Sequence, residues 1–252
     1  MMEQEQVQET PELLATSLEA FARELETLQD CPDLRQAQKK CPQIANDKDF
    51  HLLFLRTEVF HVDQAAKRYA KYWKDRAELW QEKAFQELCI DQEDAVEASY
   101  GFIGTVDQQE RIIYLAVGRL NKDRDVDSLC RVCLVTTLEA LRKSTALQQK
   151  GAVILMDFHR CTGYDKVFYE RYGQVTQDSF PLRVSLVGIV RPLPAMGLIV
   201  DIIKLFLKRK LRNRIHVIRN DAALQKHTAI DSVNGLLTRV STPARLVAAA
   251  KA

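Results

Sequence analysis

The segment Gly151-Ala-Val-Ile-Leu-Met-Asp157 decides the fold class of this 252-residue chain. It is a continuous apolar run that ends at an acidic residue, a pattern typical of a β-strand that helices cover on both faces. Three further strands are predicted over residues 111–117, 184–190 and 214–218. Helical periodicity is found over about 126–150, 164–177 and 195–210. Strands that alternate with helices predict an α/β domain with a mostly parallel or mixed sheet.

The residues before about position 90 instead predict a small all-helical module. Thr10-Pro11 is typical of an N-cap followed by the first helical residue, and this helix is expected to end at Cys31-Pro32. Further helices are predicted from Asp49 to about Thr57 and from the N-cap candidate Asp63 to about Lys83. The inward-facing residues of the last helix are interpreted as core: Ala66, Tyr69, Trp73, Ala77 and Trp80. We expect three parts, which are a module over 10–88, an α/β domain over 100–222 and a tail over 223–252.

Charge is distributed unevenly, although the whole chain carries a net charge of only +2. Residues 1–110 have 12 basic and 23 acidic side chains, whereas residues 111–252 have 24 and 11. The extremes are residues 1–33, with nine acids and one base, and residues 183–219, with nine bases and one acid. The second half therefore predicts an anionic partner. We do not expect that partner to be a nucleic acid, because the basic cluster has little aromatic character beyond Phe206.

Several common kinds of catalytic site are missing from the sequence. Neither GxGxxG nor GxxxxGK[ST] occurs, so the usual phosphate cradles of nucleotide-binding proteins are absent. Asp157, His159 and Cys161 alternate after a strand end, where catalytic groups often lie, but no GxSxG motif accompanies them. A surface loop is the alternative interpretation of these three residues. We expect no enzymatic activity and no cofactor.

The six cysteines indicate neither a disulfide scaffold nor a metal site. The N-terminus lacks the apolar core of a secretory signal, so we expect reduced thiols and a cytoplasmic location. Cys130 and Cys133 lie in a helical pattern without a second CxxC pair, which favours buried cysteines over metal ligands. Asp123, Asp125 and Asp127 lack the glycine and glutamate of a calcium loop, so we expect one of them to cap a helix.

Residues 195–219 combine a very apolar helix with a dense basic end. The apolar face comprises Met196, Ile199, Val200, Ile203, Phe206 and Leu207, and Ile202 widens it. Such a helix can close over an apolar cavity and enter a membrane interface while basic residues hold anionic headgroups. The alternative is a buried helix that ends in a solvated, charged turn. A transmembrane span is not expected, because Pro192 and Pro194 divide the apolar run over 184–207.

Four segments carry a resemblance to a known family. They are DFHLLFLRTEVFHV (49–62), GAVILMD (151–157), DSFPLRV (178–184) and KLFLKRKLRNRIHV (204–217). In this order they resemble the motifs of the CRAL-TRIO lipid-binding proteins, which include tocopherol, retinaldehyde and phosphatidylinositol carriers. The resemblance implies an α/β/α sandwich behind a helical N-terminal module. It also implies a hydrophobic pocket closed by a mobile gate helix, which by position is Ala195–Leu207.

The resemblance also assigns candidate site residues. Those of the pocket and gate are Ile113, Leu115, Val117, Ile154, Met156, Phe168, Val187, Ile189, Met196, Ile199, Ile202, Ile203 and Phe206. Those for an anionic headgroup or membrane surface are Arg56, Arg183, Lys204, Lys208, Lys210 and Arg214. Leu182 stands where phosphatidylinositol carriers have an acid, which argues against an inositol headgroup inside the pocket. Arg191 departs from the INxP motif of many members.

Two functions follow as hypotheses. In the first, the protein binds a hydrophobic small molecule or lipid and transfers it between membranes, docking through the basic patch beside the gate helix. It would be cytoplasmic and reversibly bound to an anionic membrane surface. In the second, a regulatory or scaffold protein uses the same fold to recruit phosphoinositides or a protein partner without transfer.

Overall fold

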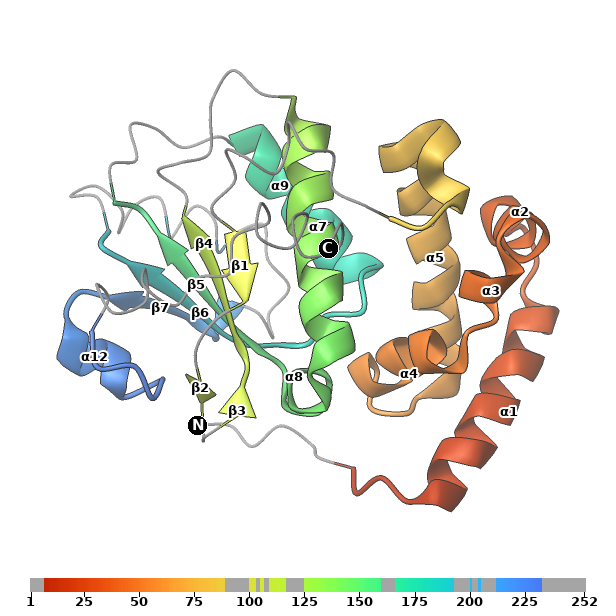
Figure 1. Ribbon diagram of the computed structural model, residues 1–252, viewed down its shortest axis with the longest axis horizontal. Helices are drawn as coiled ribbons and strands as arrows, with labels where there is room; N and C mark the ends of the chain where they lie inside the picture. The colour runs from red at the N-terminus through yellow and green to blue at the C-terminus, as the bar shows by residue number, and fades with distance from the viewer. Residues whose placement is uncertain are drawn as a thin grey trace, which may run out of the picture. The chain divides into compact units, whose positions relative to one another are not determined.

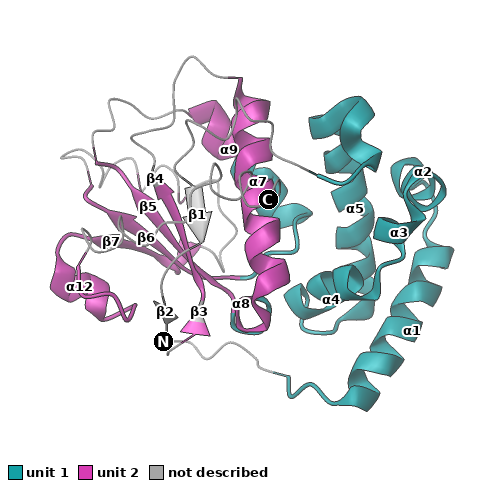
Figure 2. Ribbon diagram, in the orientation of Figure 1, with its two compact units in different colours: residues 1–89, 148–150, 172–183 teal, residues 90–147, 151–171, 184–252 magenta. Residues whose placement is uncertain are grey.

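The computed structural model describes residues 7–88, 100–102, 105–106, 109–116, 125–159, 166–192, 200, 204 and 212–232. The chain divides into two compact units (Figure 2). The first unit comprises residues 1–89, 148–150 and 172–183, and the second comprises residues 90–147, 151–171 and 184–252. The helical first unit therefore includes two short pieces from the second half of the sequence.

The first unit is built from five α-helices and a 3₁₀-helix among its described N-terminal residues. They are α1 (Pro11–Thr27), α2 (Pro32–Lys40), α3 (Pro42–Ala45), α4 (Lys48–Thr57), α5 (Val62–Trp80) and η1 (Gln81–Phe85) (Figure 1). Thr10 caps α1 as predicted, because its hydroxyl accepts a 3.1 Å hydrogen bond from the amide of Leu13. The prediction that α1 reaches Cys31 is wrong, since it ends at Thr27. Helices α2 and α3 were not predicted.

Aromatic side chains form the core of this unit. Tyr69 of α5 lies fully buried, with its ring centroid 4.8 Å from that of Phe54 and 5.7 Å from that of Phe21. Ala66, Tyr69 and Trp73 are buried as predicted, whereas Ala77 and Trp80 are only half-buried. The predicted cap of α5 is also wrong, because the N-cap residue is His61 and Asp63 lies in the first turn.

The second unit contains a five-stranded sheet with the order β1-β4-β5-β6-β7. These strands are β1 (Tyr100–Phe102), β4 (Ile112–Ala116), β5 (Ala152–Asp157), β6 (Val184–Val190) and β7 (Ile215–Ile218). Strands β4 to β7 are mutually parallel, and β1 is antiparallel to β4, which confirms the predicted α/β fold with a mixed sheet. A separate antiparallel pair, β2 (Thr105–Val106) and β3 (Gln109–Glu110), was not predicted.

The helices of the second half differ in detail from the prediction. The helix predicted over about 126–150 is two helices, α7 (Val126–Lys143) and α8 (Thr145–Lys150), because Ser144 leaves the helical conformation and caps α8. The carboxylate of Asp125 caps α7, as expected for one of the three aspartates. Helix α9 (Lys166–Asp178) is confirmed, and α12 (Asp221–Gln225) lies next to β7. Figure 1 shows α7 beside β1.

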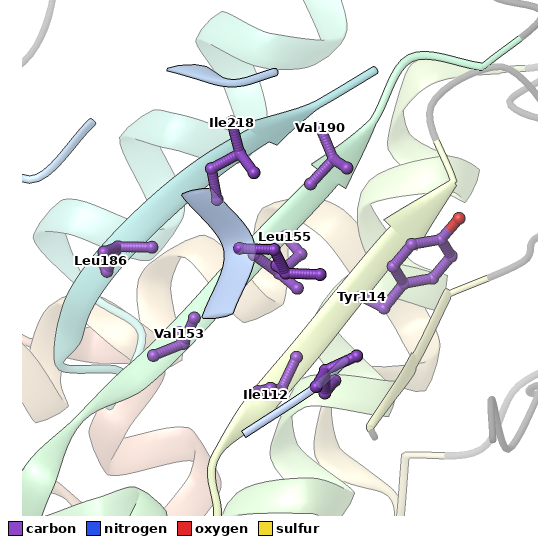
Figure 3. Close-up of a cluster of buried hydrophobic side chains, with 9 residues drawn as sticks. Ile112, Tyr114, Val153, Leu155, Leu186, Val190 and Ile218 are labelled. Carbon is purple, nitrogen blue, oxygen red and sulfur yellow. The ribbon is translucent and has the colours of Figure 1, made fainter. Parts of the chain in front are cut away.

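One face of the sheet carries a closed apolar cluster (Figure 3). The cluster comprises Ile112, Tyr114, Val153, Leu155, Leu186, Val190, Ile218, Leu224 and Ile230. Gly188 lies within this face, where an added Cβ would meet Ile218 Cδ1 at 2.6 Å and Leu155 Cδ2 at 2.8 Å. A larger residue at position 188 would therefore force the ends of the Ile218 and Leu155 side chains to shift.

Candidate functional site

The predicted pocket residues of the sheet occupy two rows on its other face. Register pairs Ile113 with Ile154 and Ile154 with Val187, and we call these three residues the Ile113 row. Two residues further along, Leu115, Met156 and Ile189 pair in the same way and form the Leu115 row. Because side chains alternate along a strand, both rows face away from the cluster of Figure 3. That the two rows line a ligand pocket stays a prediction.

Strand β7 extends both rows by one residue each, and these two residues were not predicted. Ile215 pairs with Val187 and Val217 pairs with Ile189. Four of the eight side chains in the extended rows are Ile, and none is polar. The strand itself was predicted, but which of its residues share a face with the rows depends on register, which no local pattern encodes.

Several predicted pocket residues lie elsewhere. Phe168 of α9 is buried, and its ring centroid lies 5.1 Å from that of Tyr169. Within the predicted gate helix, Val200 is buried and Lys204 is half-buried. The other predicted residues lie outside the described part of the chain: Val117, Met196, Ile199, Ile202, Ile203, Phe206, Lys208 and Lys210.

A network of polar side chains lies at the carboxyl ends of β4, β5 and β6. Asp157, the last residue of β5, is buried, and its carboxylate accepts hydrogen bonds from the Tyr114 hydroxyl, from both Nε and Nη2 of Arg191, and from the His159 amide at 2.9 Å. Arg191 follows β6 directly and has a φ of 48°, in the left-handed region that non-glycine residues rarely adopt. The two-point contact with Asp157 holds this strained residue in place.

The network fixes the charge of its members. Burial alone disfavours the Asp157 carboxylate, but the hydrogen bonds from Arg191, Tyr114 and the His159 amide outweigh it and lower the pKa of Asp157. Burial and the neighbouring carboxylate raise the pKa of Tyr114, so the phenol stays protonated and donates. The alternative interpretation of Asp157, His159 and Cys161 was a catalytic site, and the structure describes the first two of these residues. The Asp157 carboxylate accepts hydrogen bonds from Arg191, not from an imidazole.

The CxxC cysteines are buried in α7, as the sequence predicts. Burial raises the pKa of Cys130 to about 12 and that of Cys133 well above its ordinary value, so both remain thiols at neutral pH. No group of three metal-binding side chains occurs among the described residues. The cysteines therefore contribute to packing.

Two of the predicted basic residues, Arg56 and Arg183, line one cavity of about 230 Å³ in the first unit. We call it the cationic pocket, and its lining residues are Val7, Gln8, Glu9, Arg56, Val59, Phe60, Gln149, Lys150 and Arg183. Lys150 was not predicted, because it lies at the end of α8 and gives no motif signal. The charged lining residues have a formal sum of +2, from three bases and Glu9.

Arg56, in the last turn of α4, is already engaged. Its Nε and Nη2 donate to the two carboxylate oxygens of Glu9 at 2.8 Å and 2.7 Å, and its Nη1 donates to Gln148. Arg183 donates from Nη1 to the backbone carbonyl of Gln149 at 2.9 Å. After α4 the chain turns through Val59 and Phe60, with φ of 54° and 62°, and both residues form part of the pocket wall. Such strained residues occur where surrounding structure holds them.

The remaining predicted basic residues, Lys204 and Arg214, belong to the second unit. Arg214 donates from Nη1 to the backbone carbonyl of Val184, and partial burial lowers its pKa.

Among the described residues, no helix is both long and apolar enough to cross a membrane.

Comparison with known proteins places these features in context. The model of the CRAL/TRIO domain family matches residues 97–235, more than half of the chain. Proteins named "Alpha-tocopherol transfer protein-like", from Pongo abelii and Homo sapiens, are each 28% identical over 208 residues, which cover 77% of this chain and 59% of the relative. The chain thus spans less than two thirds of the length of these relatives. The solved structure "Crystal structure of Sfh5" matches 95% of both chains at 13% identity with a TM-score of 0.59, which shows a shared fold.

Proposed function

Because this chain belongs to the CRAL/TRIO domain family, we propose that it binds a hydrophobic small molecule or lipid in an internal pocket and transfers it between membranes. The observation that carries the proposal is the pair of apolar rows. The Ile113 row and the Leu115 row cross three parallel strands on one face, and β7 extends both without introducing a polar side chain. An apolar ligand on such a floor gains roughly 25 cal/mol for each Å² of its surface removed from water.

A carrier also needs a cover over the floor, and the gate helix 195–207 is proposed for that role. The buried Val200 supports it, since this residue lies on the predicted apolar face of the gate. The names of the relatives point to tocopherol transfer, and we take from them only that the cargo of this chain is lipophilic.

Membrane docking is proposed through Lys204 in the gate and through the basic residues that follow it, Lys208, Lys210 and Arg214. Each basic side chain near an anionic leaflet contributes about 1 kcal/mol, so four of them suffice for reversible attachment. The half-buried Lys204 leaves its long side chain able to place its charge at an interface.

CRAL-TRIO proteins are mostly lipid carriers rather than enzymes, and we propose that this chain is a carrier too. The Asp157 carboxylate is saturated by Arg191, Tyr114 and an amide, so it is not available as a general base. We interpret the network as structural.

The test is extraction of lipid from vesicles by the full chain, followed by native mass spectrometry of the complex. We expect about one lipid bound per chain. Failure to extract any lipid from vesicles or from a cell-lipid mixture would exclude the carrier function. Binding without donor-to-acceptor vesicle transfer would instead favour the regulatory or scaffold alternative.

Two neighbouring residues of β6 provide a matched pair for locating the pocket. Val187 lies in the Ile113 row and Leu186 lies in the cluster of Figure 3, and both are 9% exposed. V187W is expected to fill the pocket and lower ligand affinity about tenfold with little loss of stability. L186W is expected to overpack a closed core and cost about 1–3 kcal/mol while the folded fraction still binds ligand. The opposite pattern would move the pocket to the other face.

Docking is tested by charge reversal. K210E/R214E is expected to weaken binding to vesicles of phosphatidylcholine and phosphatidylserine, with a reduced dependence on salt. K39E/K40E changes the net charge equally on the exposed end of α2 and serves as the control. If both double variants behave alike, docking depends on overall charge rather than on this patch.

A further inference from the structure

The residues just before α1 form part of the cationic pocket of the first unit. Val7, Gln8 and Glu9 line it together with Arg56, Lys150, Arg183 and others. Glu9 binds Arg56 in the two-point geometry described above, and the two side chains are only 10% and 12% exposed. Arg56 therefore cannot bind any other anion through Nε and Nη2 while Glu9 is in place.

The chemistry of the guanidinium group shows what else would fit there. Its paired N–H groups match carboxylate and phosphate oxygens in the same geometry. Lys150 and Arg183 line the same cavity, so three basic side chains and one carboxylate share its wall. Without Glu9 the formal charge of the lining rises from +2 to +3, and a phosphate monoester carries close to two negative charges at neutral pH.

We infer that Glu9 is an internal competitor, and that a phosphate monoester reaches Arg56, Lys150 and Arg183 only after displacing it. Residues 7–9 are then an autoinhibitory segment for the cationic pocket. This inference rests on the proposed headgroup role of Arg56 and Arg183. The phosphate belongs either to a phosphorylated lipid headgroup in a membrane or to a soluble organic phosphate.

The position of Glu9 allows it to leave without unfolding a helix. Residues 7–9 are not helical, and Val7 and Gln8 are exposed. Thr10 caps α1 through its own hydroxyl, so the first turn of α1 keeps its cap when Glu9 moves away. At neutral pH Glu9 is ionised: burial opposes this, but hydrogen bonds from Arg56 and Gln149 lower its pKa overall.

The measurements use the full chain, with E9Q as the test variant and E12Q as its control. Glu12 lies three residues away in the first turn of α1, is exposed, and loses the same charge on substitution. A second test variant, E9Q/R56Q, removes the cation as well. Binding of inositol hexakisphosphate is measured by titration calorimetry. Binding to phosphatidylcholine vesicles is measured with a phosphatidylinositol phosphate, and with phosphatidylserine at matched charge.

We expect E9Q to bind the phosphate monoester about tenfold more tightly than the parent chain. E12Q should stay within about twofold of the parent, because an exposed charge is screened. E9Q/R56Q should lose the gain. An increase on phosphatidylinositol phosphate vesicles without one for the soluble phosphate identifies a lipid headgroup, and an increase with both identifies phosphate from either source.

Equal gains in E9Q and E12Q would overturn the inference, because long-range charge would then explain both. An unchanged affinity of E9Q for the phosphate would also overturn the inference, provided that a thermal transition shows the variant to be folded. Glu9 would then have only a structural role. E9A repeats the test if E9Q is unstable. The outcome is separate from the carrier proposal, since lipid extraction can succeed when the Glu9 effect is absent, and the Glu9 effect can occur when extraction fails.

Discussion

Among the described residues, the Asp157–Arg191 pair and the Glu9–Arg56 pair share a two-point geometry but differ in their surroundings. In the second unit, Asp157 is 2% exposed and pairs with Arg191 at the carboxyl ends of the parallel strands. In the first unit, Glu9 is 10% exposed and pairs with Arg56 at the wall of a cavity. The Tyr114 hydroxyl and the His159 amide also donate hydrogen bonds to Asp157. The Glu9–Arg56 pair instead lines its cavity together with two further basic residues, Lys150 and Arg183.

The groups that surround a buried acid–arginine pair decide its role. An acid surrounded by donors that all point at it has no competitor, and removing it leaves those donors without an acceptor. An acid that shares a cavity wall with several basic side chains can be exchanged for another anion of matching geometry. We therefore interpret the Asp157 pair as structural and the Glu9 pair as exchangeable, and four predictions test this comparison.

The largest effect is expected for D157A. The substitution leaves Arg191 and the Tyr114 hydroxyl without their carboxylate, so the free energy of unfolding should fall by about 3–5 kcal/mol. Urea unfolding followed by circular dichroism measures it. D127A is the control, because Asp127 pairs with Arg171 at 3.5 Å on the surface and should cost at most about 1 kcal/mol. Equal losses in both variants would contradict a structural role for the Asp157 pair.

Y114F removes one donor and keeps the ring in the apolar cluster. A hydrogen bond to a charged group contributes about 1.5–3 kcal/mol, and we expect a loss at the lower end because Arg191 still binds Asp157. The same unfolding experiment measures the loss. A neutral or stabilising outcome would mean that the phenol contributes nothing to the network.

Acid should weaken both pairs through the same linkage. The pKa values of Asp157 and Glu9 are lowered in the folded chain, so their stabilisation is complete above the ordinary carboxyl pKa values and is lost as pH falls through the folded values. For each carboxylate that is protonated in the unfolded but not in the folded chain, the free energy of unfolding changes by up to about 1.4 kcal/mol per pH unit. D157N should make the acid limb of a stability–pH curve shallower, and an unchanged limb would contradict the assignment.

The smallest effect is expected for E9A, whose unfolding free energy should change by about 1 kcal/mol or less. The cavity of about 230 Å³ beside Arg56 is large enough to hold water, which solvates the guanidinium group when the carboxylate is gone. Thermal unfolding measures the change, with E12A as its control at an exposed site. A loss as large as that of D157A would remove the contrast between the two pairs and make Glu9 structural as well.

The sequence predicts the sheet well because residues 152–156 and 186–190 carry no polar side chain, and such runs are recognised without knowledge of their partners. It misses α2 and α3 because both are short, and α2 is largely polar, so no apolar period marks them. It misses the break at Ser144 because the helical period continues across it, and the Ser144 hydroxyl that caps α8 gives no periodic signal.

The polar contacts of the site also could not be predicted, because their partners are far apart in the sequence. Arg191 departs from the family motif, and this departure can be read from the sequence, but its partner Asp157 lies 34 residues away and depends on how β5 and β6 pair. Glu9 and Arg56 are separated by 47 residues, and the acidic character of residues 1–33 alone does not show which carboxylate meets which base. Local pattern identifies the elements, whereas the tertiary structure selects the pairs.

The inclusion of residues 172–183 in the first unit has a consequence for biosynthesis. Phe180 is buried against Tyr72, with 6.3 Å between their ring centroids, and its carbonyl accepts a hydrogen bond from Arg68 at 3.0 Å. The N-terminal module therefore lacks part of its core until the ribosome has synthesised residues 172–183. A nascent chain stalled before residue 180 would expose this apolar surface and be a substrate for chaperones.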